Sequence, residues 1–441
     1  MARAAPKSPV TRDTVFVAGG QPSVTYVERD HLKIRDDLQR ALKVPNQIVS
    51  LAGPTKTGKT VLCKEILGDK EYVWVEGGQI ESSHQIWDKI CYILNYPVEI
   101  SKSHREEGKA GFTAGLKNFF SVEGSLLSSE EGKRTYKIDS MSSAIKRLSD
   151  RMITLVVDDF HYLPPEARTS FLRNIKGPVF NGLKLVLLSV THRGLDAVKA
   201  ENELQGRVYS VISPPWDIAD LKMIGERGFA ALNIICPARI LSRLADEAQG
   251  SPFLMQKLCW EICAGIGVDQ RPSDPITISD QYDFVPICER LSRDFGHPIY
   301  QKLEVGPQSR KSRRKRRLKS GGTADIYKAI LMAISATGPN ASISYEELRL
   351  GLVDLLAEDP PQKHEVTSAL KHLASISQNI GNDAGIDWDA DERKIDISDP
   401  YLRFYLRWQI RPVATSRSSQ YELRLATQAF SRLLDRVIGK K

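Results

Sequence analysis

The 441-residue sequence contains no long hydrophobic run and no apolar leader. Its apolar stretches, such as residues 183–190, are much shorter than the roughly 20 residues that cross a bilayer. The first residues, MARAAPKSPVTRDTVF, lack the apolar core of a signal peptide. We therefore predict a cytoplasmic protein without a membrane partner.

Cysteine is also scarce, with six residues spread over the chain. Cys259 and Cys263 are four residues apart, which places them on one face of a helix. No second Cys or His pair follows at zinc-finger spacing, so the pattern does not favour a metal site. Reduced and mostly buried thiols are the expected state.

Positive charge is concentrated in one segment. The net charge is +8, and residues 310–319 alone carry eight positive charges, so the rest of the chain is close to neutral. Such a run is typical either of a phosphate-binding segment or of a solvated linker. The candidate nucleic-acid contacts in it are Arg313, Arg314, Lys315, Arg316 and Arg317.

The order of periodic segments predicts an α/β fold. Strands are expected at 48–51, 72–75, 153–157, 183–190 and 207–212, with helices between them. This alternation is typical of a parallel sheet covered by helices on both faces. Three helices near 324–335, 344–356 and 363–376, followed by strands at 386–388 and 394–397, indicate a winged helix.

These segments define the predicted domains. Residues 1–20 are expected to be disordered, and 21–213 to form a P-loop NTPase core with an insertion at 101–137. A helical lid (214–300), a basic linker (301–323), the C-terminal winged-helix domain (324–412) and a C-terminal helix (413–441) follow.

The strongest motif lies between the first strand and its helix. Residues 53–60 match the pattern G-x-x-x-x-G-K-[ST] in the context that this motif requires, strand before and helix after. In such a loop the backbone N–H groups and the helix N-terminus face the phosphates of a nucleotide. Lys59 would contact the β- and γ-phosphates, and Thr60 would ligate Mg²⁺. The loop consists of Gly53, Pro54, Thr55, Lys56, Thr57, Gly58, Lys59 and Thr60.

A pair of carboxylates follows the apolar strand at 153–157. Buried carboxylates are costly unless cations or water meet them, and in a P-loop fold this strand end lies beside the nucleotide. Asp158 is therefore the expected Mg²⁺ ligand, and Asp159 the group that orients or deprotonates the attacking water. His161, just beyond, is expected to be a surface histidine.

A third polar element, Thr191-His192-Arg193, follows the strand at 183–190. A polar group at this position can contact the γ-phosphate. Arg193 is the better candidate because its charge is permanent. The alternative is a helix-entry residue that faces solvent.

With these motifs the sequence resembles the AAA+ and STAND branches of the P-loop ATPases. It is most similar in pattern to origin-recognition initiators and to archaeal-type ATPases that end in a winged helix. The resemblance covers roughly residues 22–265, and more loosely 324–410. It implies an additional strand between the P-loop strand and the strand of Asp158, and residues 72–75 fit that position.

Three shorter matches support the resemblance. Residues 26–30 resemble the N-terminal box that lies against adenine, which implies that Tyr26, Val27 and Arg29 contact the base. Residues 250–252 resemble the G-x-P motif of the STAND lid, which implies that Pro252 packs near the base. Residues 399–404, DPYLRF, are similar to the segment that closes the winged domain.

Two departures from the family pattern affect the expected activity. The usual catalytic residue is Glu, whereas Asp159 is one methylene shorter, which indicates slow hydrolysis and a switch-like protein. No arginine occupies the lid at residues 251–253, where many AAA+ proteins place a second sensor; Arg239 or Arg243 would have to replace it.

The sequence therefore predicts an ATP- and Mg²⁺-binding switch with a DNA or protein partner, or a homo-oligomer. One alternative is a STAND-type signalling or defence ATPase that acts through proteins without DNA. Another is a transposition or replication helper that oligomerises on DNA. The helix at 363–376 would be the recognition helix of a DNA-binding winged helix, but it is only mildly basic. The hairpin formed by the strands at 386–388 and 394–397 is acidic, which fits a DNA backbone poorly.

Overall fold

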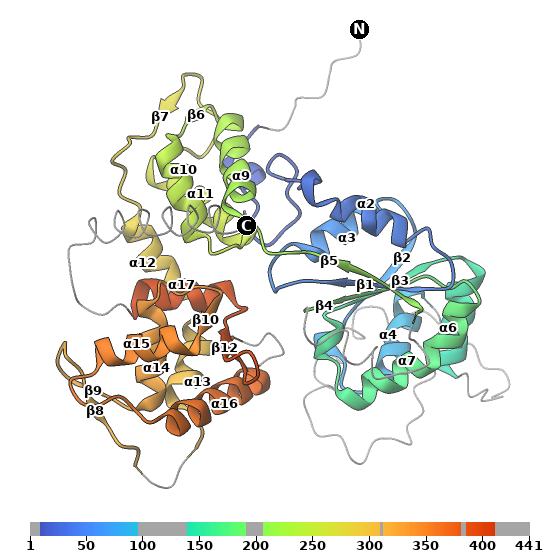
Figure 1. Ribbon diagram of the computed structural model, residues 1–441. Helices are drawn as coiled ribbons and strands as arrows, with labels where there is room; N and C mark the ends of the chain where they lie inside the picture. The colour runs from blue at the N-terminus through green and yellow to red at the C-terminus, as the bar shows by residue number, and fades with distance from the viewer. Residues whose placement is uncertain (1–8, 96–138, 191–205, 309–311, 381–384, 411–441) are drawn as a thin grey trace, which may run out of the picture. The chain divides into compact units, whose positions relative to one another are not determined.

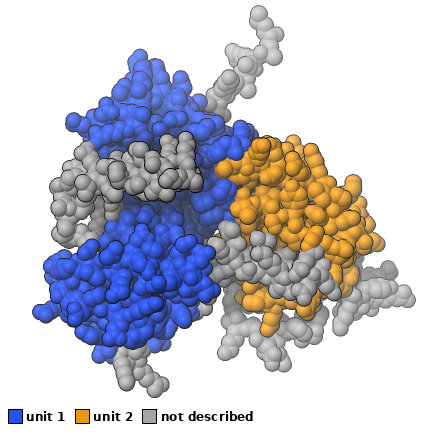
Figure 2. Space-filling model, in the orientation of Figure 1, with its two compact units in different colours: residues 1–31, 53–61, 213–441 blue, residues 32–52, 62–212 orange. Residues whose placement is uncertain are grey.

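The computed structural model describes residues 9–95, 139–190, 206–308, 312–380 and 385–410. The chain divides into two compact units (Figures 1 and 2). Unit 1 comprises residues 1–31, 53–61 and 213–441, and unit 2 comprises 32–52 and 62–212. No helix in the described ranges has both the length and the apolar character needed to span a membrane. The predicted insertion at 101–137 and the predicted C-terminal helix at 413–441 lie outside the described residues.

Unit 2 is built on a five-stranded parallel sheet with the order β2-β3-β4-β1-β5. The strands are β1 (Ile48–Ala52), β2 (Tyr72–Glu76), β3 (Thr154–Asp158), β4 (Leu185–Ser189) and β5 (Val208–Ile212). Every residue of β1, β3 and β4 is buried, as expected for strands covered on both faces. The α/β fold predicted from the alternating segments is confirmed.

Helices cover both faces of this sheet (Figure 1). One core includes Trp87 of α4 (Ser83–Ile93), Leu148 of α6 (Ser140–Asp150) and Phe171 of α7 (Pro165–Phe180). The other includes Leu38 of α2 (Ile34–Ala41) and Cys63 of α3 (Lys59–Leu67). Burial of each large side chain stabilises the layer by roughly 1.5–3 kcal/mol.

The position of the additional strand differs from the prediction. Strand β4 lies between the P-loop strand β1 and the Asp158 strand β3, and among the described residues β2 pairs with β3 at the edge of the sheet. The assignment of residues 72–75 to the inserted position was therefore wrong. Chain order does not determine sheet order, because a parallel crossover can pass over a neighbouring strand.

The first part of unit 1 is helical. It contains α9 (Ile218–Ala231), α10 (Ala238–Glu247), α11 (Pro252–Gly265) and α12 (Val285–Asp294), with a two-residue strand pair, β6 (Ile234–Ile235) and β7 (Ile276–Thr277). These helices share one hydrophobic core.

The N-terminal segment is more ordered than its composition predicts. Residues 9–20 include the short helix α1 (Arg12–Val15), and the ring of Phe16 packs edge-on against Phe229 at 5.2 Å. Gly228 makes room for this contact, since a Cβ there would lie 2.2 Å from the Phe16 ring. The prediction of disorder was wrong for residues 9–20, because long-range contacts hold this segment: Phe16 packs on Phe229, and Arg12 pairs with Asp269 at 2.9 Å.

The C-terminal part of unit 1 has the elements of a winged helix. It contains α13 (His297–Val305), α14 (Ile326–Ala336), α15 (Tyr345–Leu355), α16 (Lys363–Ile380) and α17 (Pro400–Gln409). A small antiparallel sheet has the order β10 (Ser342–Ser344), β12 (Lys394–Asp396), β11 (Asp387–Asp389). The winged-helix prediction is confirmed, although β10 was not anticipated.

Part of the predicted basic linker at 301–323 is folded. Helix α13 extends to Val305, and β8 (Arg316–Arg317) pairs with β9 (Thr323–Ala324). The remaining domain boundaries stay predictions.

Candidate nucleotide-binding site

The loop of residues 53–60 connects β1 to α3 and has the strained backbone that its glycines allow. Lys56 and Gly58 have φ values of 59° and 86°, in the left-handed region. Gly53 lies so close to the chain that a Cβ would be 2.3 Å from the Ser213 carbonyl oxygen. The Thr57 hydroxyl donates to the Pro54 carbonyl at 3.0 Å and closes the turn. The loop therefore presents its backbone at the start of a nine-residue helix, where N–H groups favour anions.

Lys59 is the buried cation of this loop. Only 9% of the residue is exposed, and its Nζ donates to the carbonyl oxygens of Gly53 and Pro54 at 3.0 and 2.7 Å. These bonds fix the ammonium on the loop that it belongs to. An ammonium, successive backbone N–H groups and a helix N-terminus form a donor set that suits a triphosphate.

The chain entering α9 packs against the other side of the loop. Trp216 donates its indole N–H to the Thr57 carbonyl oxygen at 2.8 Å. The Arg29 guanidinium stacks on Trp216 at 4.6 Å and donates to the Pro214 carbonyl and the Ser213 hydroxyl at 3.0 and 3.1 Å. Burial lowers the pKa of Arg29. Arg29 thus holds the lid entry, a contact that the sequence did not reveal.

A pocket of 380 Å³ adjoins this region. The predicted base contacts Tyr26, Val27 and Arg29 all line it, whereas Pro252 does not. Pro252 instead begins α11, behind the capping residue Ser251. The volume falls within the range of small-ligand sites. The pocket is lined by Tyr26, Val27, Glu28, Arg29, Asp30, His31, Asp220, Met223 and Arg227.

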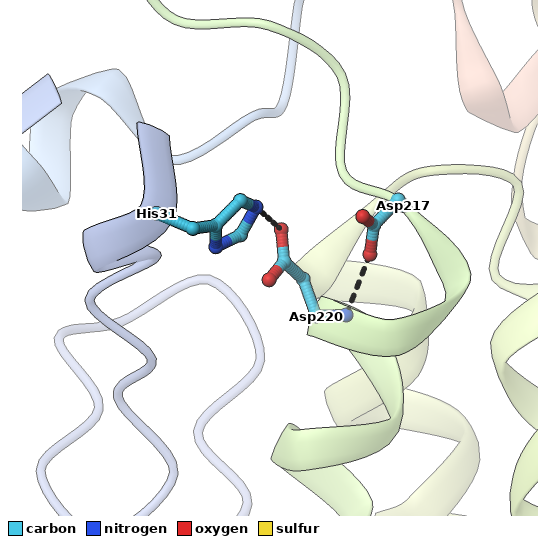
Figure 3. Close-up of side chains that lie close together, drawn as sticks. All are labelled: His31, Asp217 and Asp220. Atoms are coloured by element: carbon cyan, nitrogen blue, oxygen red, sulfur yellow. Dashed lines mark hydrogen bonds and ion pairs between the residues drawn. The ribbon is translucent and has the colours of Figure 1, made fainter. Parts of the chain in front are cut away.

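Two residues that line the pocket, His31 and Asp220, form with Asp217 the group shown in Figure 3, which could not be recognised from the sequence. His31 Nε2 lies 3.8 Å from an Asp220 carboxylate oxygen, and Asp217 accepts from the Asp220 backbone N–H at 2.7 Å as the cap of α9. Asp220 is 4% exposed, and burial, followed by the charge of Asp217, raises its pKa. One ligand atom of each residue lies within 4.8 Å of the others, which is close enough for a cation.

In unit 2 the carboxylate pair lies at the carboxyl end of β3. Asp158 is 9% exposed, and its carboxylate accepts from the Asp159 backbone N–H at 2.9 Å. Asp159 is exposed and has a left-handed φ of 52°. Burial, followed by the charge of Asp158, raises the pKa of Cys63 in α3 to about 12.

The predictions for His161 and for the segment 191–193 have different outcomes. His161 is 3% exposed and stacks on Tyr162 at 4.6 Å, so the prediction of a surface histidine was wrong. Thr191, His192 and Arg193 lie outside the described residues.

The basic run is largely engaged within the C-terminal part of unit 1. The side chain of Arg316 is 3% exposed and pairs with Glu365 at 2.9 Å, and Arg313 pairs with Asp325 at 3.0 Å. Arg314 and Arg317 both pair with Glu358 but are 70% and 80% exposed. Lys315 is exposed as well.

The two arginines considered as substitutes for a lid sensor, Arg239 and Arg243, are both on α10. Arg239 is exposed on α10, and Arg243 stacks on the ring of Phe284 at 4.4 Å. A different arginine reaches the lid motif: Arg403 of α17 donates to the Gln249 carbonyl oxygen at 2.6 Å. The sequence could not indicate this contact, because the two residues belong to distant segments.

Comparison with known proteins gives structural matches but no sequence match. Neither the protein-family models nor the curated proteins match the sequence. The Walker-type ATPase of Pyrococcus abyssi matches with a TM-score of 0.50 and 13% identity over 87% of this chain and 100% of that one. The Orc1 protein of Aeropyrum pernix, solved in complex with DNA, matches with a TM-score of 0.45 and 14% identity over 90% and 96% of the two chains.

A STAND protein with a tetratricopeptide repeat sensor from Pyrococcus horikoshii is also similar. Its TM-score is 0.36 at 13% identity, over 94% of this chain and 46% of that one. The match to the Pyrococcus abyssi ATPase shows a shared fold. This chain therefore shares its fold with a Walker-type ATPase, as the resemblance to P-loop ATPases predicted, at a distant level of similarity.

Proposed function

We propose that the protein binds ATP with Mg²⁺ at the loop of residues 53–60 and acts as a slowly hydrolysing switch that engages a partner. The observation that supports this most directly is the buried Lys59 ammonium, held by loop carbonyls at the start of α3. A buried cation at a helix N-terminus is an arrangement suited to phosphate.

Each predicted site residue has one role in this proposal. Lys59 binds the β- and γ-phosphates, while Thr60 and Asp158 are the Mg²⁺ ligands. When bound, Mg²⁺ neutralises charge on the phosphates. Asp159 orients the attacking water, and Arg193 contacts the γ-phosphate.

Recognition of the base is assigned to the 380 Å³ pocket. Tyr26 and Val27 line it, and Arg29 holds the adjoining lid entry through Ser213 and Trp216. The short side chain of Asp159 supports slow turnover, because a carboxylate must be within hydrogen-bond reach of the water that it activates.

Asp159→Asn tests the catalytic part. We expect Mg²⁺-dependent ATP hydrolysis to fall at least about 100-fold, within the range for loss of a general base, while ATP affinity stays within about threefold. Asp150→Asn, the same change at an exposed position on α6, is the matched control and should hydrolyse ATP like the parent. Retained turnover in Asp159→Asn, or loss of ATP binding in a folded variant, would contradict the assignment.

DNA is the second candidate partner, because Arg314, Lys315 and Arg317 are exposed in the C-terminal part of unit 1. Two observations favour a protein partner or a second copy instead. Arg313 and Arg316 are paired within the domain, and the hairpin of β11 and β12 carries acidic residues. These acids are Asp387, Asp389, Asp391, Glu392 and Asp396.

A further inference from the structure

Helix α17 begins in a tightly fixed first turn. The Asp399 carboxylate, 1% exposed, caps the helix by accepting from the Tyr401 backbone N–H at 2.9 Å. Gly296 allows the chain to approach this turn, because a Cβ there would lie 2.4 Å from the Tyr401 carbonyl oxygen. The position of Tyr401 is therefore determined by backbone contacts.

The ring of Tyr401 contacts the phosphate loop. Lys56 Nζ lies 4.4 Å from the centre of this ring, within the range of a cation–π interaction. Phe253 and Phe295 pack against the ring at 5.5 and 5.0 Å and hold it in place. A winged-helix residue thus holds a cation of the loop that we assign to ATP.

Lys56 occupies a position that glycine would fill with less strain. Its φ of 59° lies in the left-handed region, which is unfavourable for an L-residue with a Cβ. The contact with Tyr401 offsets this cost, because a cation–π interaction of the ammonium with the ring is stabilising.

The rest of α17 is anchored on the lid. Arg403 donates to the Gln249 carbonyl, immediately before the Gly250-Ser251-Pro252 motif. One turn further, Arg407 pairs with Asp246 and Glu247 at 2.5 and 2.9 Å, where Glu247 is 1% exposed. A single helix therefore connects the phosphate loop to the lid.

We propose that Tyr401 is a nucleotide-responsive positioning residue that competes with a bound triphosphate for the Lys56 ammonium. The proposal rests on the proposed function. A phosphate oxygen attracts an ammonium more strongly than the face of a ring does, so ATP draws Lys56 away from Tyr401. ADP lacks the γ-phosphate and leaves the contact in place.

This competition links nucleotide state to α17. By linkage, a contact that only ATP must break lowers the affinity for ATP relative to ADP. Loss of the ring contact removes the link between the phosphate loop and the first turn of α17, while Arg403 and Arg407 still hold the helix on the lid. The contact between Lys56 and Tyr401 thereby makes the first turn of α17, in the winged-helix part of unit 1, sensitive to the bound nucleotide.

The test measures ATP and ADP affinities of the full chain by displacement of a fluorescent nucleotide analogue. We expect Tyr401→Leu to tighten ATP binding roughly 2- to 5-fold and to leave ADP binding unchanged, which corresponds to the loss of a half-buried cation–π contact at the weaker end of the usual range. Tyr401→Phe keeps the ring and should behave like the parent. If Leu disrupts folding, as judged by circular dichroism, Tyr401→Met fills the same space with a flexible side chain.

A double-mutant cycle separates this role from a structural one. In a Lys56→Met background, Tyr401→Leu should no longer change the ratio of ATP to ADP affinity. An unchanged ratio in Tyr401→Leu, or the same change in both backgrounds, would overturn the proposal. If the parent binds neither nucleotide, the proposed function itself is wrong, which is a distinct outcome.

Discussion

The phosphate loop and the basic run are both rich in cations, yet the structure uses them differently. Lys59, 9% exposed, donates to carbonyls of its own loop at the start of a helix. Arg316, 3% exposed, donates twice to Glu365, a residue of the separate helix α16. The first arrangement organises a short loop around a positive charge, and the second joins two segments of a folded domain. Charge density alone therefore does not indicate a ligand site, because cations that are close in sequence can be paired within a folded domain.

The largest expected effect is at the loop. We expect Lys59→Ala to weaken ATP binding roughly 100-fold, because removal of one partner of a buried charged contact costs about 2–5 kcal/mol. Titration with a fluorescent ATP analogue measures this effect. Lys64→Ala, on the same helix but stacked on Trp74, is the control and should bind ATP like the parent. If Lys59→Ala and the parent bound ATP with equal affinity, the phosphate loop would not differ from the basic run in its role toward a ligand.

The next effect is on the stability of the C-terminal part of unit 1. We expect Arg316→Gln to lower it by about 2 kcal/mol, below the 3–5 kcal/mol of a fully buried pair, since the Glu365 side chain is 35% exposed. The matched change Arg317→Gln, at an 80% exposed side chain, should cost about 0.5 kcal/mol or less. Hydrogen exchange of α16 reports both effects. Equal protection in the two variants would show that the buried pair does not stabilise the domain.

The same pair gives a pH dependence. Burial alone would raise the pKa of Glu365, but hydrogen bonds from the Gln362 backbone N–H and from Arg316 outweigh it, so the pKa is lowered overall. A depressed pKa means that the stabilisation is present above the unfolded value of about 4.3 and is lost as the pH falls through the folded value. The difference in stability between Arg316→Gln and the parent, measured by hydrogen exchange of α16, should therefore shrink below about pH 4.

The smallest expected effect is at the exposed part of the run. Replacing Arg314, Lys315 and Arg317 by Gln should leave ATP affinity and folding unchanged. We expect weak binding of duplex DNA by the parent at low salt, and a decrease of about 2–3 in the salt slope of the variant. Titration at several salt concentrations measures the slope. An unchanged slope would exclude these residues as DNA contacts, and an absence of low-salt binding would favour a protein partner.

Features that depend on neighbouring residues in the sequence could be predicted. The strand, glycine loop and helix around Lys59 follow from backbone chemistry, and the three helices and hairpin of the winged helix follow from hydrophobic periodicity. Asp158 was placed at the end of a buried strand for the same reason, and the structure has it there.

Contacts between distant segments could not be predicted. Nothing near Arg316 in the sequence indicates Glu365, and nothing near Lys56 indicates Tyr401. The prediction that β2 lies between β1 and β3 in the sheet was wrong for the same reason. Hydrophobic periodicity describes one segment and does not indicate which strand pairs with it. Packing of Phe16 against Phe229 likewise orders an N-terminal segment whose composition suggested disorder.

Calorimetric titration of the purified full chain with ATP in magnesium buffer tests the central claim most directly. Saturable heat at one ATP per chain, absent from an otherwise folded Lys59→Ala variant, is the result that the account predicts. A parent protein that takes up neither ATP nor GTP under these conditions would contradict it.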